Sequence, residues 1–149
     1  MNRKRLSLIL LTIFSITILL SIANIFLEDS NTIEKENGTI TINNQAKHYE
    51  KSGKCVDVID ANTIQVYGVG RVQLTQVGNA TEEGTNFVKD KCLGKIVYLD
   101  IDDKQPKDKY GRTLAIVYTD ECDINQELIK NNMTQVSHFE PSEFEKGKV

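Results

Sequence analysis

An uncharged apolar run of 22 residues, from Leu6 to Leu27, sets the first part of the chain apart from the mixed pattern that follows. At about 1.5 Å of rise per residue, a helix over this run is roughly 33 Å long, enough to cross a bilayer core of about 30 Å. Arg3-Lys4-Arg5 precede the run, and Glu28 and Asp29 follow it. This order predicts a membrane-spanning anchor within residues 1–27, with the N-terminus inside and the rest of the chain outside.

A cleaved signal peptide is the alternative, because Ser21-Ile22-Ala23 is a small-x-small sequence of the kind found at cleavage sites. Either interpretation exports the rest of the chain, as a single-pass protein of the cell membrane or as a secreted one. Residues 28–52 are polar and contain asparagine-rich patches such as Asn43-Asn44. We predict a flexible stalk there, with at most one short strand at Thr39–Ile42.

From residue 53 onward, short runs of apolar and β-branched residues alternate with turn residues. In the run that begins at Arg71, alternation with a period of two places Val72 and Leu74 on one face. We predict five strands from such runs. They cover Cys55–Ile59, Thr63–Tyr67, Arg71–Val77, Lys95–Asp100 and Arg112–Thr119.

Two helices are predicted from their capping residues. Thr81 is a suitable N-cap for a helix that runs to about Leu93, where Gly94 ends it. Asp123 is a suitable N-cap for a second helix over Ile124–Asn131.

Five strands, with one helix between the third and the fourth and another after the fifth, suit a small closed barrel of the OB type. We therefore predict an α+β, mainly β domain over residues 53–144, followed by a tail at 145–149. Its length is that of one small domain, and we expect a monomer.

After residue 27 the chain carries 15 basic and 21 acidic residues, a net charge of −6. Nonspecific binding to nucleic acid depends on Lys and Arg side chains that displace counterions, so an acidic surface disfavours it. Any nucleic-acid role must depend on a local patch.

Such a patch is predicted at Asp108-Lys109-Tyr110-Gly111-Arg112, which leads directly into the last strand. The glycine turn places an arginine at the strand start, beside a lysine and a tyrosine. Two cations and a phenol on one short arc suit the oxygens of a phosphate group. Taken alone, the local pattern favours an ordinary charged β-turn.

Together with the strand–turn–strand sequence Val58-Ile59-Asp60-Ala61-Asn62-Thr63, this loop resembles the thermonuclease (staphylococcal-nuclease-like) family. The resemblance implies an OB-type barrel, hydrolysis of phosphodiesters with a Ca²⁺ ion, and a nucleic acid or nucleotide as ligand. It also implies that Arg112 is a catalytic arginine and that Lys109 and Tyr110 contact phosphate.

The positions that hold the metal in that family are changed here. Asn62 stands at the first metal aspartate and Gly78 at the second. Because Ca²⁺ prefers several oxygen ligands, best with anionic ones among them, Asp60 and Asn62 are only weak metal candidates. The water-positioning glutamate falls at Thr81, and only a shift of one residue allows Glu82 to take this catalytic role.

Two further positions differ from the family pattern. Gln73 replaces its first arginine, and Arg71, which shares a strand face with Gln73, is a candidate substitute. His138 falls at a tyrosine that stacks on the base. Each lost role typically costs on the order of 10² to 10⁴ in rate, so we expect no efficient calcium-dependent nuclease.

Cys55, Cys92 and Cys122 allow three disulfide pairings. The resemblance places Cys55 and Cys92 at buried positions and favours that pair, with three free thiols as the alternative. It also implies that the third helix of the family is absent after Pro141, or reduced to a single turn.

Three functions remain open. The first is a membrane-tethered, extracytoplasmic thermonuclease-like domain, impaired in hydrolysis, that binds a phosphate-bearing ligand through the loop and needs no cofactor. The second is an active nuclease that uses Ca²⁺ at the weakened metal set. The third is a surface protein-interaction module, favoured by the net charge and by glycosylation sequons at Asn37, Asn79 and Asn132.

Overall fold

The computed structural model describes residues 37–138 and 140–146. The anchor or signal peptide predicted within residues 1–27 lies outside this part of the chain, as do the first residues of the predicted stalk. No helix in the described part is long and apolar enough to cross a membrane.

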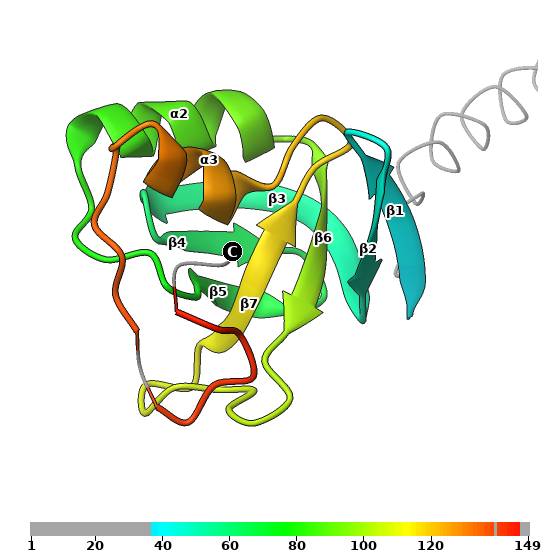
Figure 1. Cartoon of the computed structure of the whole chain (residues 1–149). Helices are drawn as coiled ribbons and strands as arrows, with labels where there is room; N and C mark the ends of the chain where they lie inside the picture. The colour runs from blue at the N-terminus through cyan, green and yellow to red at the C-terminus, as the bar shows by residue number, and fades with distance from the viewer. Residues whose placement is uncertain (1–36, 139, 147–149) are drawn as a thin grey trace, which may run out of the picture. The chain divides into compact units, whose positions relative to one another are not determined.

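Five strands close into a barrel in the order β3-β4-β5-β7-β6 (Figure 1). Neighbouring strands are antiparallel, except that β5 and β7 run parallel. The predicted five-stranded, mainly β barrel is therefore confirmed. Its strands are β3 (Lys51–Asp60), β4 (Thr63–Val66), β5 (Gly70–Leu74), β6 (Ile96–Ile101) and β7 (Thr113–Tyr118).

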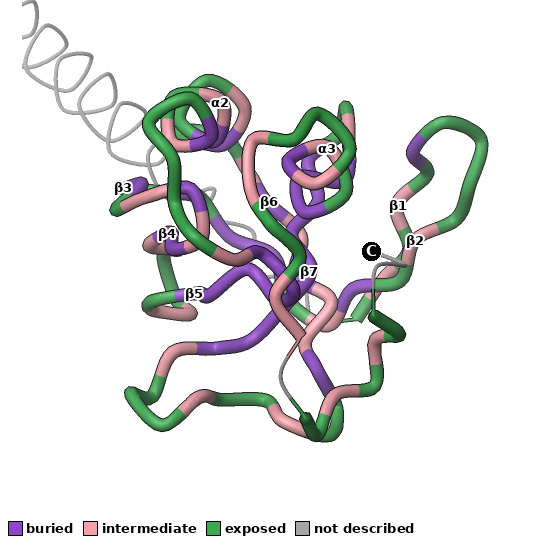
Figure 2. The backbone as a smooth tube through the Cα atoms, turned by 60° about the vertical axis from the view of Figure 1, so that its left-hand side comes forward, coloured by how far each residue is buried: buried purple, intermediate pink, exposed green. Residues whose placement is uncertain are grey.

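The barrel interior is filled by aliphatic side chains from every strand, among them Val58, Ile64, Leu74, Leu99 and Val117. Figure 2 shows buried residues along β4, β5 and β7. All six residues of β7 are buried, because the strand lies between two others and is covered by α3. Burial of this apolar surface is the main stabilising term of the domain.

Both predicted helices are present at their predicted caps. The Oγ1 atom of Thr81 accepts a hydrogen bond from Gly84 N (3.0 Å) at the start of α2 (Glu82–Cys92). Asp123 accepts one from Gln126 N (2.9 Å) at the start of α3 (Ile124–Lys130). The two helices lie together at one end of the barrel (Figure 1).

The short strand predicted at Thr39–Ile42 is present, but the flexible stalk predicted around it is wrong for residues 38–49. They form a hairpin of β1 (Gly38–Ile42) and β2 (Gln45–Tyr49), joined at Asn43-Asn44. Both asparagines have positive φ, as two-residue hairpin turns require, so the patch that suggested flexibility is a turn. Tyr49 is buried, and its ring lies 4.9 Å from that of Tyr98 on β6.

The chain after α3 crosses to the other end of the barrel (Figure 1), and its described residues contain no helix. Its last part is held by two buried side chains. Asp102 accepts hydrogen bonds from Ser142 Oγ and Glu143 N, and Gln76 Nε2 donates to the carbonyl of Glu145 (2.9 Å). Ser137 and Glu140, earlier in this part of the chain, line a cavity.

Candidate functional site

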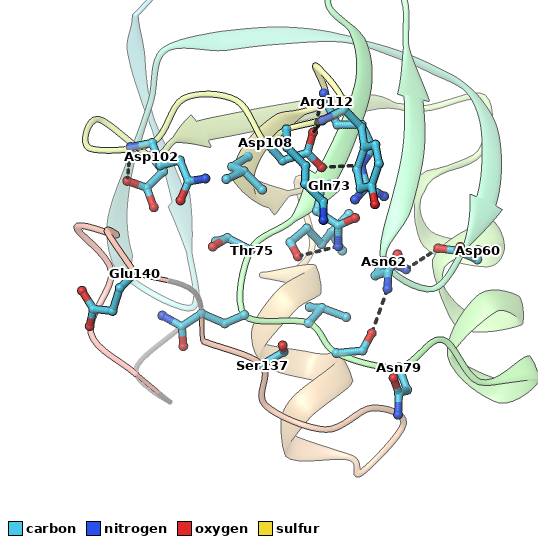
Figure 3. A pocket seen from close by; sticks show the side chains of 18 residues that line it. Asp60, Asn62, Gln73, Thr75, Asn79, Asp102, Asp108, Arg112, Ser137 and Glu140 are labelled. Atoms are coloured by element: carbon cyan, nitrogen blue, oxygen red, sulfur yellow. Dashed lines mark hydrogen bonds and ion pairs between the residues drawn. The ribbon is translucent and has the colours of Figure 1, made fainter.

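A cavity of about 650 Å³ lies between the turn that joins β3 to β4 and the loop that leads into β7. Four parts of the chain line it, namely the turn between β3 and β4, residues 73–79, the loop between β6 and β7, and the C-terminal part of the chain through Ser137 and Glu140 (Figure 3). Its polar lining side chains are Asp60, Asn62, Gln73, Thr75, Gln76, Asn79, Asp102, Gln105, Asp108, Lys109, Tyr110, Arg112, Ser137 and Glu140.

Asp108 organises the loop before β7. One of its oxygens accepts hydrogen bonds from Tyr110 N (2.8 Å) and Arg112 N (2.9 Å), and the other accepts from Arg112 Nε (2.6 Å). Gly111 has a φ of +80°, a conformation that side chains with a Cβ rarely adopt, and its N–H donates back to the Asp108 carbonyl (3.0 Å). The loop is therefore a tight turn with its arginine held in place.

Asp108 is the counter-ion of Arg112 in this turn. Burial acts to raise the pKa of its carboxyl, but hydrogen bonds from Arg112 and from the backbone outweigh burial and hold the pKa below its ordinary value. Asp108 is thus ionised and paired at neutral pH, which makes it a poor proton acceptor for catalysis.

The structure brings the three predicted phosphate contacts together. Lys109 Nζ lies 5.0 Å from the centre of the Tyr110 ring, and Arg112 Cζ lies 5.5 Å from it. The ring is 72% exposed. Two cations therefore flank one accessible phenol at the mouth of the cavity, the arrangement that the sequence predicted for binding phosphate.

Asn62 uses both ends of its amide within the protein. Its Nδ2 donates to the carbonyl of Gly78 (2.8 Å), and its Oδ1 accepts from Thr63 Oγ1 (2.8 Å). The Thr63 hydroxyl in turn accepts from Arg112 Nη1 (3.3 Å). Figure 3 shows Asn62 between the arginine and the chain at the lower edge of the cavity.

Gly78 lies where the C-terminal part of the chain passes over residues 76–79. Its N–H donates to the carbonyl of Gln135 (2.8 Å), and Val77 forms a bridge with Val136. A Cβ atom added to Gly78 would lie 2.7 Å from the Gln135 carbonyl oxygen, closer than real Cβ atoms come to backbone. No larger residue fits at position 78 unless residues 135–137 move.

The model of the family described as "Staphylococcal nuclease homologue" matches residues 63–149. The chain belongs to this family. A thermonuclease of Staphylococcus hyicus is 32% identical over 108 residues, which are 62% of this chain and 63% of that protein. A thermonuclease of Staphylococcus intermedius is 36% identical over 59 residues, which are 40% of this chain and 34% of that protein. The chain spans less than two thirds of either relative.

The calcium ion that the resemblance implies does not fit the residues of this nuclease-family cavity. Asn62 offers one neutral oxygen, already bonded to Thr63, and Gly78 offers no side chain. Asp60 uses one carboxylate oxygen on Asn62 N (2.9 Å). Ca²⁺ takes six to eight oxygen ligands, and the described residues contain no group of three His, Cys, Asp or Glu side chains placed to hold a metal.

Three other predicted participants lie outside the cavity. Glu82 is exposed on the first turn of α2, and Arg71 is exposed on β5 opposite Gln65. His138 pairs with Glu140 (3.0 Å) and does not line the cavity. The positions of Glu82 and Arg71 therefore do not support the prediction that they replace lost catalytic groups.

Several lining residues were missed by the sequence analysis, among them Thr75, Gln105 and Ser137. They come from three separate segments, and each is an ordinary polar residue in its local sequence. Only the closing of the barrel and the return of the C-terminal part of the chain bring them together, so no local pattern could have identified them.

The cysteines lie in the core, away from this cavity. Cys55, Cys92 and Cys122 are free thiols in the structure, with Cys55 and Cys92 both fully buried. Burial raises the pKa of Cys55 to about 11, so this thiol is protonated and unreactive at neutral pH. The pairing of Cys55 with Cys92 remains a prediction.

Proposed function

We propose that this member of the nuclease family binds a phosphate-bearing ligand, a nucleotide or nucleic acid, without calcium, and that it hydrolyses phosphodiesters poorly. The observation that carries the proposal is the hydrogen bond from Asn62 to Gly78 beside an intact loop at residues 108–112. The lysine, tyrosine and arginine of the loop are kept. A hydrogen bond from the Asn62 side-chain amide to Gly78 takes the place of the metal-binding carboxylates that the resemblance implies.

Arg112 is prepared to accept a phosphate group. The bond to Asp108 fixes Nε and the plane of the guanidinium, whereas the bond from Nη1 to Thr63 is long at 3.3 Å. A phosphate oxygen can replace this long bond at small cost, because the arginine is already oriented. Lys109 adds a second cation beside the same ring.

Hydrolysis is disfavoured because three of the four carboxylates that line the cavity have ion-pair or multiple hydrogen-bond partners, and the fourth, Asp60, accepts a hydrogen bond from Asn62 N through one oxygen. Asp108 pairs with Arg112. Asp102 accepts hydrogen bonds from four donors of the same protein chain, which are Lys104 N, Gln105 N, Ser142 Oγ and Glu143 N. Glu140 pairs with His138. Without a divalent cation and a free base, the two largest contributions to phosphodiester cleavage are lost, each typically on the order of 10² to 10⁴ in rate.

A titration of the full chain with a 3′,5′-nucleoside bisphosphate in the presence of EDTA tests the binding half. We expect heat of binding in wild type and a loss of about tenfold or more in affinity for Arg112→Ala, because a charge-assisted bond contributes about 1.5–3 kcal/mol. Arg71→Ala, which removes an exposed arginine outside the cavity, is the matched control. Absence of heat, or equal losses in both variants, rejects the proposal.

An active calcium-dependent nuclease is the second candidate, supported by family membership and by the printed names of the two relatives. Incubation of the full chain with single-stranded DNA and millimolar Ca²⁺, against an EDTA control, separates the two. Undegraded DNA after long incubation supports the impaired domain. Degradation that requires Ca²⁺ supports the active enzyme.

We further propose that the domain is tethered to the outer face of the cell membrane as a monomer. Support comes from the basic Arg3-Lys4-Arg5, the apolar run Leu6–Leu27 and the acidic residues that follow it. Protease added to intact cells should degrade the domain, and the mass of the purified chain should include the N-terminal run. A mature chain that begins after Ala23 would indicate a cleaved signal peptide.

A further inference from the structure

Three large apolar side chains are exposed on the outer side of the barrel. They belong to Val56 on β3 (47% exposed), Tyr67 directly after β4 (54%) and Leu93 directly after α2 (45%). None of the three lines the cavity. Single exposed apolar residues are common in proteins, whereas a group of them marks an interaction surface. The positions of these residues relative to one another therefore decide what they indicate.

Backbone hydrogen bonds place Leu93 beside Val56. The N–H of Cys55 donates to the Lys95 carbonyl (2.9 Å), and the N–H of Gly94 donates to the Cys55 carbonyl (2.8 Å). The chain that leaves α2 is thus paired with β3 at the residue before Val56. Leu93 and the exposed Lys95 flank this pairing.

Tyr67 is paired with the same stretch of β3. Its N–H donates to the Lys54 carbonyl (2.9 Å). Lys54 and Val56 are exposed and Cys55 between them is fully buried, so the two exposed side chains point outward from the barrel. The pairing of β3 with β4 shifts register between Cys55 and Asp57, a bulge of the kind that redirects side chains. The name outer patch is used below for Lys54, Val56, Tyr67, Leu93 and Lys95.

The outer patch has a positive edge. Lys54 and Lys95 are exposed, and neither forms an ion pair among the described residues. Two acidic residues near them have other partners. Asp57 accepts a hydrogen bond from the next backbone N–H (2.8 Å), and Glu121, whose charge acts on Lys95, pairs with Lys91 (2.8 Å). The patch is thus cationic on a chain that has 15 basic and 21 acidic residues after residue 27.

An anionic lipid surface is the partner that fits this combination. Tyrosine is enriched at membrane–water interfaces, and lysine can bury its apolar stem while its charge reaches lipid phosphates. Binding at a bilayer surface grows with the apolar area buried and with attraction to anionic lipids. The predicted anchor at Leu6–Leu27 raises the effective concentration of lipid, so a small patch suffices. A nucleic acid matches only the two lysines and leaves the three apolar side chains without a partner.

We infer that the outer patch docks the domain on an anionic bilayer, with its apolar side chains at the level of the headgroups and its lysines on lipid phosphates. The inference rests on the proposed membrane tether and goes beyond it, because it identifies the face of the domain that meets the lipid. It uses no residue of the cavity, so its failure leaves the proposed ligand binding untouched.

A tryptophan reporter tests the inference. The chain contains no tryptophan, so Tyr67→Trp places a single fluorescent residue in the patch. The full chain is reconstituted into vesicles of phosphatidylcholine, with or without phosphatidylglycerol, that contain phospholipid brominated near the headgroup as a quencher. We expect emission that is shifted to the blue and quenched by the brominated lipid in the anionic vesicles.

Gln126→Trp is the matched control for position. Gln126 is exposed on α3, which packs on β7, and β7 neighbours neither β3 nor β4 in the barrel. A tryptophan there should show neither the shift nor the quenching.

Lys54→Gln with Lys95→Gln, in the Tyr67→Trp background, tests the positive edge. We expect the quenching in anionic vesicles to be lost, and added salt to weaken it when both lysines are present, because surface charges are screened. Lys107→Gln with Lys130→Gln removes the same charge from exposed positions outside the patch and should leave the quenching unchanged.

Sedimentation of the same samples separates the outcomes. A full chain that stays in the supernatant with every vesicle overturns the tether and this inference together. A chain that sediments while Tyr67→Trp is quenched no more than Gln126→Trp overturns this inference alone. A blue shift that appears in detergent without vesicles and grows with protein concentration assigns the patch to a second copy of the chain, and overturns the inference as well.

Discussion

The side chain of Asn62 differs from an aspartate by one group, yet that group decides what the cavity can hold. An amide N–H can donate to the Gly78 carbonyl, whereas a carboxylate oxygen in the same place would repel it. The amide therefore connects the two positions through a hydrogen bond. Two acidic side chains in these places would need a bound cation to offset their repulsion. Where the resemblance implies an aspartate that binds Ca²⁺, Asn62 instead forms a hydrogen bond to the chain at Gly78.

Asn62→Asp should lower the free energy of unfolding by about 1–2 kcal/mol in EDTA, because the bond to Gly78 is lost and two acceptors face each other. Urea denaturation measures this change. Asn79→Asp, an exposed amide in the same cavity without a side-chain partner, should change stability little. Equal stability of wild type and Asn62→Asp would show that the bond is not a structural support.

The raised pKa of Asp100 leads us to expect an unusual pH dependence of the free energy of unfolding. Burial, and then the nearby carboxylate of Glu50, raise the pKa of Asp100 from 3.8 to about 6. Because the folded state holds this proton more tightly than the unfolded state, the stabilisation is complete below pH 3.8 and is lost as the pH rises toward 6.

Asp100→Asn should therefore be more stable than wild type at pH 7, and the difference should shrink as the pH falls from about 6 to about 4. Thermal melts across this range measure it, with Asp90→Asn, an exposed position on α2, as the control. The same difference at every pH would contradict the assignment.

The hairpin of β1 and β2 is the element that the local pattern predicted least well. Its surface is polar, and its turn is an asparagine pair of the kind also found in flexible segments. Its stability comes from contact with the barrel, since Ile42 and Tyr49 are buried, and Ile42 lies in a cluster with Ile116 and Tyr118. A strand that is stable only through tertiary contact leaves a weak signal in its own sequence.

Tyr49→Ala should destabilise the domain by about 3 kcal/mol, because a buried aromatic ring beside Tyr98 is replaced by a void. Tyr67→Ala is the control, since that ring is 54% exposed. Denaturation curves compare the two. If Tyr49→Ala and Tyr67→Ala lowered the free energy of unfolding by similar small amounts, the hairpin would not pack on the barrel as described.

Across the whole molecule, the return of the chain after α3 shapes the cavity. Residues 135–137 pair with residues 76–78, and Asp102 and Gln76 hold the chain farther on. This packing leaves no room for a side chain at Gly78, so the second metal aspartate that the resemblance implies does not fit there unless residues 135–137 move.

Gly78→Asp, alone or with Asn62→Asp, should therefore fail to create a calcium-activated nuclease. We expect a loss of about 1–3 kcal/mol from the contact with the Gln135 carbonyl, and no rise in melting temperature with Ca²⁺. Gly78→Ala should lose a similar amount, which separates the steric effect from that of charge. Calcium-dependent cleavage of DNA by the double variant would overturn this view of the site.

Much of this architecture could be predicted residue by residue. The barrel strands, both helix caps at Thr81 and Asp123, and the turn at Gly111 depend on side-chain periodicity, on capping oxygens and on backbone freedom, all of which act over a few residues. The gathering of Lys109, Tyr110 and Arg112 depends on the same short range, since they share one turn. Family membership followed from such local signals.

The other half of the cavity could be known only from the folded chain. Thr75, Gln105 and Ser137 meet because strands far apart in sequence close a barrel and a late segment crosses its end. Glu82 stands one position from the water-positioning glutamate that the resemblance implies, yet the start of α2 holds it away from the cavity. Short-range forces choose the elements, whereas burial of the shared core chooses which side chains face one another.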